Sequence, residues 1–193
     1  MYRKYIKRLL DILLSLIGII LLSPIYLILY ILVLIFMGFP AIFKQQRPGK
    51  NEKIFNLYKF RTMTNKKDKD GNLLPDEQRL TKFGKFLRKT SLDELPELFN
   101  ILFGQMSFIG PRPFITGEKL PKYPDKKTYT VRPGVISLAT ANGRRKISHE
   151  ERLNYDLIYA NKVNFILDIK IFFKSICVIL KQNTKGDGEG QTK

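Results

Sequence analysis

The chain has 193 residues, and its 34 Lys and Arg against 17 Asp and Glu give a formal charge of +17. This length suits one domain with a buried core, and the excess of positive charge indicates an anionic partner such as nucleic acid, acidic lipid or a phosphorylated substrate. One Cys and one His exclude an internal disulfide and a zinc site built from the usual ligands.

A long apolar segment follows a basic N-terminus. Apart from Asp11, residues 9–43 carry no charge, and this run exceeds the roughly 20 residues that a membrane-crossing helix needs. Ser23-Pro24 interrupts it, since proline cannot donate an amide, and Ser23 can return a hydrogen bond to the carbonyl of Ile19. Basic residues flank both ends, and such flanks favour the cytoplasmic side. A broken helix that enters and leaves on one side satisfies both flanks; a tilted transmembrane anchor is the alternative.

Two short runs after this segment predict a β-hairpin. Residues 41–46 and 54–61 are typical of strands, the second by its alternation of apolar and polar side chains, and Arg47 to Asn51 between them is typical of a turn. Lys59 lies on the second strand, where it faces either a phosphate or solvent. A polar surface loop is predicted over residues 64–79.

Two adjacent acids, Asp93 and Glu94, stand at the predicted start of a helix. Ser91 fits the first position of a capping box that Glu94 would complete, and this gives one acid a purely structural role. A cap needs only one acid, however, and Pro96 follows where a helix would lose a hydrogen bond. A carboxylate near amide dipoles and basic residues stays ionised at neutral pH, so it could bind Mg²⁺ and attack phosphorus.

Two proline-containing turns each hold one arginine. Gly110-Pro111-Arg112-Pro113 and Val131-Arg132-Pro133-Gly134 restrict the backbone around that arginine, which places its guanidinium in advance for phosphate oxygens. A third turn, Asn142 to Arg145, ends in paired arginines.

The single cysteine, Cys177, falls in an apolar pattern that predicts a packed thiol. The remaining predicted elements are a strand over 135–141 and amphipathic helices over 80–88, 150–161 and 165–181.

Together these patterns predict an α+β fold that is mainly helical. The N-terminal segment, broken at Ser23-Pro24, is favoured as a re-entrant membrane helix over a transmembrane anchor. A small β-hairpin follows, with amphipathic helices, either interfacial or on the protein surface, around a cytoplasmic active site. The predicted division is a membrane-inserted segment at residues 1–43, a catalytic domain at 44–184 and a flexible tail at 185–193.

Five motifs, in this order, resemble the bacterial sugar transferase family of monotopic phosphoglycosyl transferases. They are Arg47-Pro48-Gly49, Tyr58 to Met63, Ser91 to Pro96, Met106 to Pro113 and Arg132-Pro133-Gly134. The resemblance extends over residues 7–181, and the length is similar to that of the small, minimal members of the family.

The resemblance implies transfer of a sugar 1-phosphate from a UDP-sugar to a polyprenyl phosphate, usually undecaprenyl phosphate, with release of UMP. It casts Asp93 as the nucleophile that forms a phosphosugar-aspartyl intermediate and as the Mg²⁺ ligand. It casts Glu94 as the group that deprotonates or positions the lipid phosphate. It also implies a re-entrant helix with both ends at the cytoplasmic face of a bacterial inner membrane. The basic residues assigned to substrate phosphates are Arg88, Arg112, Lys59, Arg132 and Arg145.

One stretch departs from the family pattern. Ser137 stands where glycine is usual and Thr140 where glutamine is usual, in a region expected to shape the nucleotide-sugar pocket, so the sugar is left unassigned.

Membrane lipid and downstream glycosyltransferases are the further partners expected, and specific nucleic-acid binding is not. Two other functions compete. A membrane-tethered basic binding module explains the charge but not the acidic pair, and a scaffold without catalysis is disfavoured because Asp93-Glu94 is intact.

Overall fold

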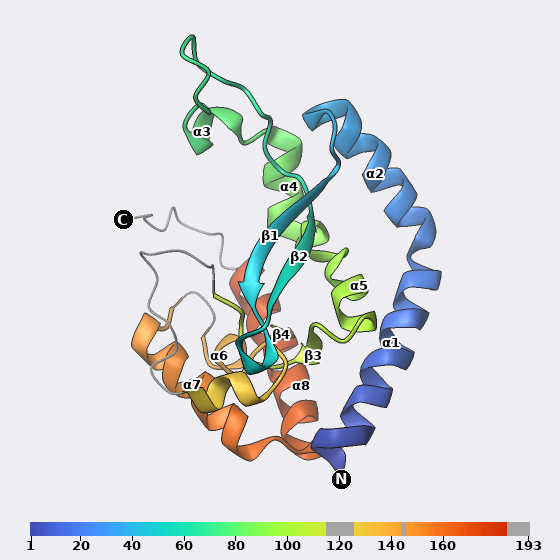
Figure 1. Ribbon diagram of the computed structural model, residues 1–193, viewed down its shortest axis with the longest axis vertical. Helices are drawn as coiled ribbons and strands as arrows, with labels where there is room; N and C mark the ends of the chain where they lie inside the picture. The colour runs from blue at the N-terminus through green and yellow to red at the C-terminus, as the bar shows by residue number, and fades with distance from the viewer. Residues whose placement is uncertain (115–125, 144–145, 185–193) are drawn as a thin grey trace. The chain divides into compact units, whose positions relative to one another are not determined.

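The computed structural model describes residues 1–114, 126–143 and 146–184 (Figure 1). The chain divides into a terminal unit, made of residues 1–11, 47–55 and 104–193, and a central unit, made of residues 12–46 and 56–103. Helices predominate over a few short strands, which confirms the mainly helical α+β fold. The predicted boundary at residue 43 stays a prediction, and the predicted flexible tail lies outside the described residues.

The apolar segment forms two helices, α1 (Lys7–Leu21) and α2 (Ser23–Met37). The helical stretches Tyr2–Leu21 and Ser23–Met37 meet at a bend of 65°. In the part of the chain that the structure describes, no single helix has the length and apolar composition to cross a bilayer, whereas this bent pair together has both. The break falls where the sequence predicts it, at Ser23-Pro24.

The hydrogen bond at the break differs by one residue from the prediction. Ser23 Oγ donates to the carbonyl of Ile20 at 2.8 Å, not to that of Ile19. In an unbroken helix the carbonyl of Ile20 would accept from the amide of residue 24, and Pro24 has no N–H. The serine hydroxyl therefore supplies the donor that the proline removes.

The predicted hairpin is present as β1 (Ile42–Pro48) and β2 (Ile54–Phe60), which pair along their length in Figure 1. In its turn, Asn51 has a φ of 56°, a left-handed conformation that asparagine tolerates better than most residues. At the other end of β2, the chain enters the polar loop, which closes with the short helix α3 (Asp76–Arg79).

In the central unit, α4 (Lys82–Thr90) packs on the apolar side of α2, with Val33, Met37 and Leu87 in one buried cluster. α4 also packs against the backbone at Thr62, and Gly84 makes this second contact possible. A Cβ at position 84 would lie 1.9 Å from the carbonyl oxygen of Thr62. The helix therefore lies directly against the backbone that follows β2.

A buried amide holds α5 (Glu97–Leu102) on β2. The side chain of Asn100 accepts a hydrogen bond from the N–H of Tyr58 at 3.0 Å and donates one to the carbonyl of Asn56 at 2.7 Å. Asn100 is fully buried, so both halves of the amide replace hydrogen bonds that water would otherwise make. This contact fixes the helix that follows the acidic pair.

In the terminal unit, β3 (Ser107–Ile109) and β4 (Gly134–Ile136) pair in parallel, with Ser107 opposite Gly134 and Ile109 opposite Ile136. The predicted strand over 135–141 is wrong after Ile136. There Ser137 begins the short helix α6 (Leu138–Ala141), since its hydroxyl accepts a hydrogen bond from the N–H of Thr140 at 3.1 Å.

The two C-terminal helices are α7 (His149–Lys162) and α8 (Phe165–Thr184), close to their predicted ranges. A capping box of Ser148 and Glu151 begins α7. The prediction of a packed thiol is wrong, because Cys177 is exposed. It lies on the side of α8 away from the fully buried Ser175.

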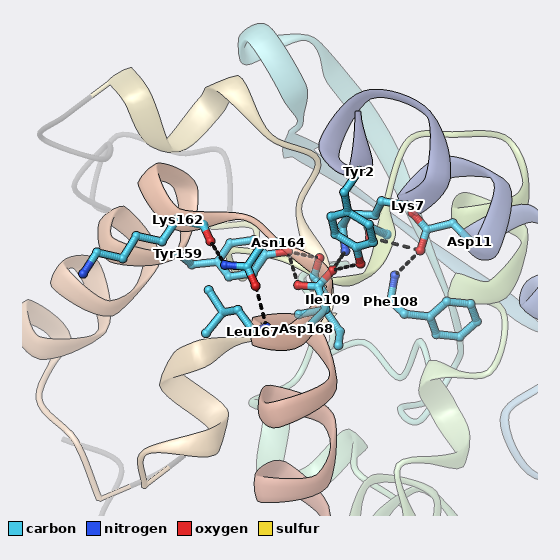
Figure 2. A network of polar contacts seen from close by, with 11 residues as sticks. Tyr2, Lys7, Asp11, Phe108, Ile109, Tyr159, Lys162, Asn164, Leu167 and Asp168 are labelled. Atoms are coloured by element: carbon cyan, nitrogen blue, oxygen red, sulfur yellow. Dashed lines mark hydrogen bonds and ion pairs between the residues drawn. The ribbon is translucent and has the colours of Figure 1, made fainter.

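A buried carboxylate on α8 holds the start of the chain (Figure 2). Asp168 accepts hydrogen bonds from the hydroxyl of Tyr2 at 2.6 Å and from the hydroxyl of Tyr159 at 2.8 Å, and it forms an ion pair with Lys7 at 2.6 Å. Burial, together with Asp168, raises the pKa of Tyr159 far above its usual value, so this hydroxyl stays protonated.

A second carboxylate, that of Asp11 in α1, bonds the N-terminal segment to β3 (Figure 2). Asp11 accepts hydrogen bonds from the hydroxyl of Ser107 and from the N–H of Phe108, both at 3.1 Å. The first eleven residues are thereby bonded to β3 as well as to α8.

Candidate active site

Asp93 and Glu94 lie in a single 3₁₀ turn, Leu92–Glu94, between α4 and α5. Ser91 follows the last residue of α4, and its φ of 56° and ψ of 19° are left-handed. This conformation costs a non-glycine residue roughly 1 kcal/mol, and such strain is concentrated at functional sites. The predicted capping box is therefore wrong. Ser91 both follows α4 and begins the turn, where its carbonyl accepts from the N–H of Glu94 at 3.2 Å, but its side chain caps no N–H of the turn.

Glu94 is instead paired with a lysine from β2. Lys59 Nζ lies 2.7 Å from Glu94 Oε1 and 3.2 Å from Glu97 Oε1. The lysine side chain is only 20% exposed, so the alternative of a solvated lysine on the hairpin is wrong. Its predicted contact with substrate phosphate stays a prediction. Sequence reasoning missed Glu97, although its position three residues after Glu94 is a spacing that places two side chains on one face of a helical turn.

Asp93 is more deeply buried than its neighbour, with 9% of its surface exposed. Burial raises the pKa of the Asp93 carboxyl above its usual value, because the charged form loses hydration. The positive charges of Lys59 and Arg88 oppose this rise, while Glu94 adds to it. The ionised form of the aspartate is favoured by Lys59, by a backbone hydrogen bond and by Arg88, and it lies in surroundings that strengthen its attraction to positive charge.

Arg88 reaches this cluster from the last turn of α4. Its Nε donates a hydrogen bond to the hydroxyl of Thr62 at 3.0 Å. Four of the predicted site residues therefore lie together in the central unit, and they come from three elements that are separate in the sequence. They are Lys59, Arg88, Asp93 and Glu94.

The two arginine-holding turns are brought together in the terminal unit. The N–H of Gly134 donates to the carbonyl of Pro111 at 2.8 Å, and a Cβ on Gly134 would lie 2.1 Å from the backbone nitrogen of Gly110. Only glycine permits this approach of two backbones. No local pattern in the sequence indicates that these two turns are neighbours, since residues 114–130 lie between them.

The arginines of these turns differ in their surroundings. Arg132 is half-buried and its Nε donates to the carbonyl of Gly104 at 2.7 Å, whereas Arg112 is exposed. Arg47 of the hairpin donates to the carbonyl of Pro113 at 2.9 Å, which ties a third motif to this group. The predicted phosphate ligand Arg145 lies outside the described residues.

The residues that depart from the family pattern also lie together. Ser137 Oγ and Thr140 Oγ1 are 3.1 Å apart, at the start of α6. A glycine at position 137 would have no hydroxyl to cap this helix, so the two departures form one local arrangement.

The acidic turn offers two adjacent carboxylates, which are oxygen donors of the kind that Mg²⁺ binds. In residues 1–114, 126–143 and 146–184, no three side chains of His, Cys, Asp or Glu form a group that could hold a metal without help. Mg²⁺ needs fewer protein ligands, since it usually binds one or two carboxylates together with waters and substrate phosphates. Asp93, with Glu94 beside it, fits this requirement.

Comparison with known proteins agrees with these motifs. The sequence profile described as bacterial sugar transferase matches residues 2–182. The sugar transferase EpsL of Bacillus subtilis is 46% identical over 158 residues, which cover 81% of this chain and 76% of that protein.

Two longer relatives are named for their substrates. The UDP-glucose:undecaprenyl-phosphate glucose-1-phosphate transferase of Klebsiella pneumoniae is 41% identical over 181 residues, 88% of this chain and 39% of that protein. The undecaprenyl-phosphate galactose phosphotransferase of Salmonella typhimurium is 36% identical over 200 residues, 93% of this chain and 41% of that protein. This chain thus spans about two fifths of each. With nearly its whole length matched by the family profile, the chain belongs to the bacterial sugar transferase family.

Proposed function

We propose that this chain transfers a sugar 1-phosphate from a UDP-sugar to undecaprenyl phosphate and thereby starts a bacterial glycoconjugate. Family membership and the names of the Klebsiella and Salmonella relatives support the class of reaction. The observation that carries the proposal is Asp93, a buried carboxylate balanced between Lys59 and Arg88. A scaffold or a basic binding module has no use for such a group.

In the first step, a carboxylate oxygen of Asp93 attacks the phosphorus that bears the sugar. A new Asp–O–P bond forms, the bond from this phosphorus to the oxygen shared with UMP breaks, and UMP leaves with the electron pair. Lys59 and Arg88 offset the negative charge on the phosphoryl oxygens. Arg112 and Arg132 are further candidates for contact with the diphosphate.

In the second step, a phosphate oxygen of the lipid acceptor attacks the same phosphorus. The Asp–O–P bond breaks, the aspartate is released as a carboxylate, and the sugar is left on a lipid diphosphate. Glu94 serves this step by removing a proton from the acceptor phosphate or by fixing its position. A covalent intermediate lets a water-soluble donor and a lipid acceptor use one site in turn.

Mg²⁺ is the cofactor that suits this donor set, with Asp93 as its protein ligand. When bound, it would neutralise charge on the phosphate oxygens and make UMP a better leaving group.

The bent pair α1–α2 suits insertion from the cytoplasmic face of the inner membrane, with both of its ends returning to that face. Downstream glycosyltransferases would then take over the lipid-linked sugar.

The test is intact-mass measurement of the purified protein incubated with Mg²⁺ and a panel of UDP-sugars, without lipid. We expect an adduct with the mass of one sugar phosphate, an equal amount of UMP, and no adduct in Asp93→Asn. The exposed Asp76→Asn is the matched control and should form the adduct. If no donor gives an adduct while added undecaprenyl phosphate still yields UMP, transfer is direct and the role given to Asp93 is wrong.

A further inference from the structure

The central unit contains an apolar groove of about 750 Å³, beside the acidic turn. Its walls come from α2, from both strands of the hairpin and from α5, and aromatic rings contribute most of the lining. This volume lies within the range of about 300–1,000 Å³ that is usual for small-molecule sites. The reaction steps proposed above leave the groove without a role.

One aromatic residue joins the groove to the acidic turn. Tyr26 packs against Phe60 and Phe99, with ring centroids 5.9 and 5.8 Å apart, and its hydroxyl donates to the carbonyl of Leu95. Pro96, the next residue, is itself part of the wall. One residue of the groove wall therefore stands only two positions after Glu94 in the sequence.

The composition of the walls selects the ligand. Lys44 is the one charged residue among those that line the groove, and its Nζ lies 5.9 Å from the centre of the Tyr58 ring. A nucleotide sugar would leave many polar groups without partners on such walls, which is costly. A branched hydrocarbon chain with an anionic end matches them, because the chain can lie on the aromatic rings and Lys44 can face the anion.

The groove is also accessible from the apolar helices. Leu27 and Tyr30 of α2 line it and remain 62% and 38% exposed, respectively. Because α2 belongs to the bent pair proposed to enter the bilayer, a lipid can reach the groove without leaving an apolar environment.

We propose that this groove binds the first isoprene units of the polyprenyl phosphate acceptor, with the lipid phosphate directed toward the acidic turn and Lys44 at its side. This inference rests on the function proposed above, and it adds the place where the acceptor is held. Nucleotide sugar is excluded from the groove, and the remainder of the prenyl chain stays in the lipid.

The experiment compares Leu27→Trp with Ile28→Trp. Both replace an exposed aliphatic residue of α2 by tryptophan, but only Leu27 lines the groove; Ile28 is 56% exposed and outside it. Each variant is first loaded with sugar phosphate from the UDP-sugar, and its discharge to undecaprenyl phosphate in detergent micelles is then followed per loaded molecule. We expect Leu27→Trp to raise the half-saturating acceptor concentration about tenfold. This factor corresponds to about two methylene groups of the prenyl chain that are no longer buried in the groove. Ile28→Trp should stay within about twofold of the unchanged protein.

Equal half-saturating concentrations in the two variants would overturn the groove assignment, as would the same increase in both. If neither variant nor the unchanged protein can be loaded with sugar phosphate, the result contradicts the proposed function and not the groove. The groove is then tested by the binding of a polyprenyl phosphate alone. Asp93→Asn protein is then irradiated with a polyprenyl phosphate that carries a photoreactive group on its first isoprene units. The groove predicts cross-links in the peptide that contains Phe99 and Phe103, and their loss with Leu27→Trp. Cross-links elsewhere, or unchanged cross-links, would refute it.

Discussion

At the scale of single residues, Asp93 has to meet two opposed requirements. A nucleophile must be ionised, yet burial favours the neutral acid and raises the pKa of Asp93. The positive charges of Lys59 and Arg88 favour the ionised form of Asp93, and Lys59 also forms ion pairs with Glu94 and Glu97. Neighbouring cations therefore partly offset the effect of burial on this carboxyl.

Replacement of Lys59 by glutamine should move the pH dependence of adduct formation to higher pH. The lysine lowers the pKa of Asp93, so its removal raises that pKa, and the ionised nucleophile is reached only at higher pH. The measurement is the single-turnover rate of adduct formation between about pH 4 and pH 8. Lys66→Gln, on the exposed loop, is the control and should leave the profile unchanged. An acid limb at the same pH in both variants would contradict the role of Lys59.

Asp93→Asn should make the protein more stable at pH 7. The folded protein binds the proton of Asp93 more tightly than the unfolded chain does, so stability falls as pH rises through the raised pKa. The neutral amide avoids this loss, so Asp93→Asn should have a higher Tm than the unchanged protein at pH 7. Below about pH 4, where both states hold the proton, the difference should disappear. Thermal unfolding at the two pH values measures it, and a lower Tm at pH 7 would show that Asp93 is a stabilising group.

At the scale of elements, the acidic turn is held by the helices on either side. α4 lies on the backbone at Thr62 through Gly84, and α5 is bonded to β2 through Asn100. The strained Ser91 joins these two fixed helices, so the turn has little freedom to relax. The position of Asp93 therefore depends on contacts that involve no charged group.

Gly84→Ala tests this dependence. A methyl group would lie 1.9 Å from the Thr62 carbonyl oxygen, so α4 has to move away from the chain after β2. We expect a loss of about 1–3 kcal/mol of stability and a fall in adduct yield per folded molecule. Lys85→Ala, at the next and exposed position, is the control for the helix itself. Normal adduct yield in a destabilised Gly84→Ala protein would show that the turn is not positioned by this contact.

At the scale of the whole molecule, the chain combines a net charge of +17 with an apolar N-terminal helix pair. The start of that pair is bonded to residues more than 150 positions away, because Tyr2 and Lys7 both contact Asp168. The segment is therefore part of the folded protein and not only an appended anchor.

Asp168→Asn should destabilise the protein strongly. It removes the charge that pairs with Lys7, whose side chain is 14% exposed, and removing one partner of a buried ion pair costs about 3–5 kcal/mol. Asp76→Asn breaks an exposed ion pair with Arg79 instead, and such pairs contribute about 0–1 kcal/mol. Chemical denaturation of the two variants measures the difference. Equal stabilities would mean that the Asp168 contacts do not hold the N-terminal segment.

The two ends of the helix pair should lie on the same side of the membrane. Single cysteines at Arg3 and Lys50, in a Cys177→Ser background, should both react with an impermeant maleimide in inside-out vesicles and neither in intact cells. Cys177 is exposed and would otherwise react. A combined Ser23→Ala and Pro24→Ala change removes the break and should place the ends on opposite sides. Opposite sides in the unchanged protein would establish the transmembrane alternative.

The sequence by itself determined the elements whose signals are local. The break at Ser23-Pro24, the hairpin and the helices at the C-terminus follow from proline geometry, turn residues and hydrophobic periodicity, which act within a few residues. The ordered motifs were enough to identify the family. Local signals also misled: the capping pattern at Ser91 and the apolar run after Ile136 fit other structures equally well.

Only the tertiary structure decided which charges meet. Lys59, Arg88 and the acidic pair are separated by up to 35 residues, and their meeting depends on Asn100 and Gly84, which carry no chemical signal of their own. Glu97 and the apolar groove were missed for the same reason. Such contacts arise from packing between distant segments, and packing is selected by shape and burial over the whole unit rather than by the pattern of any one stretch.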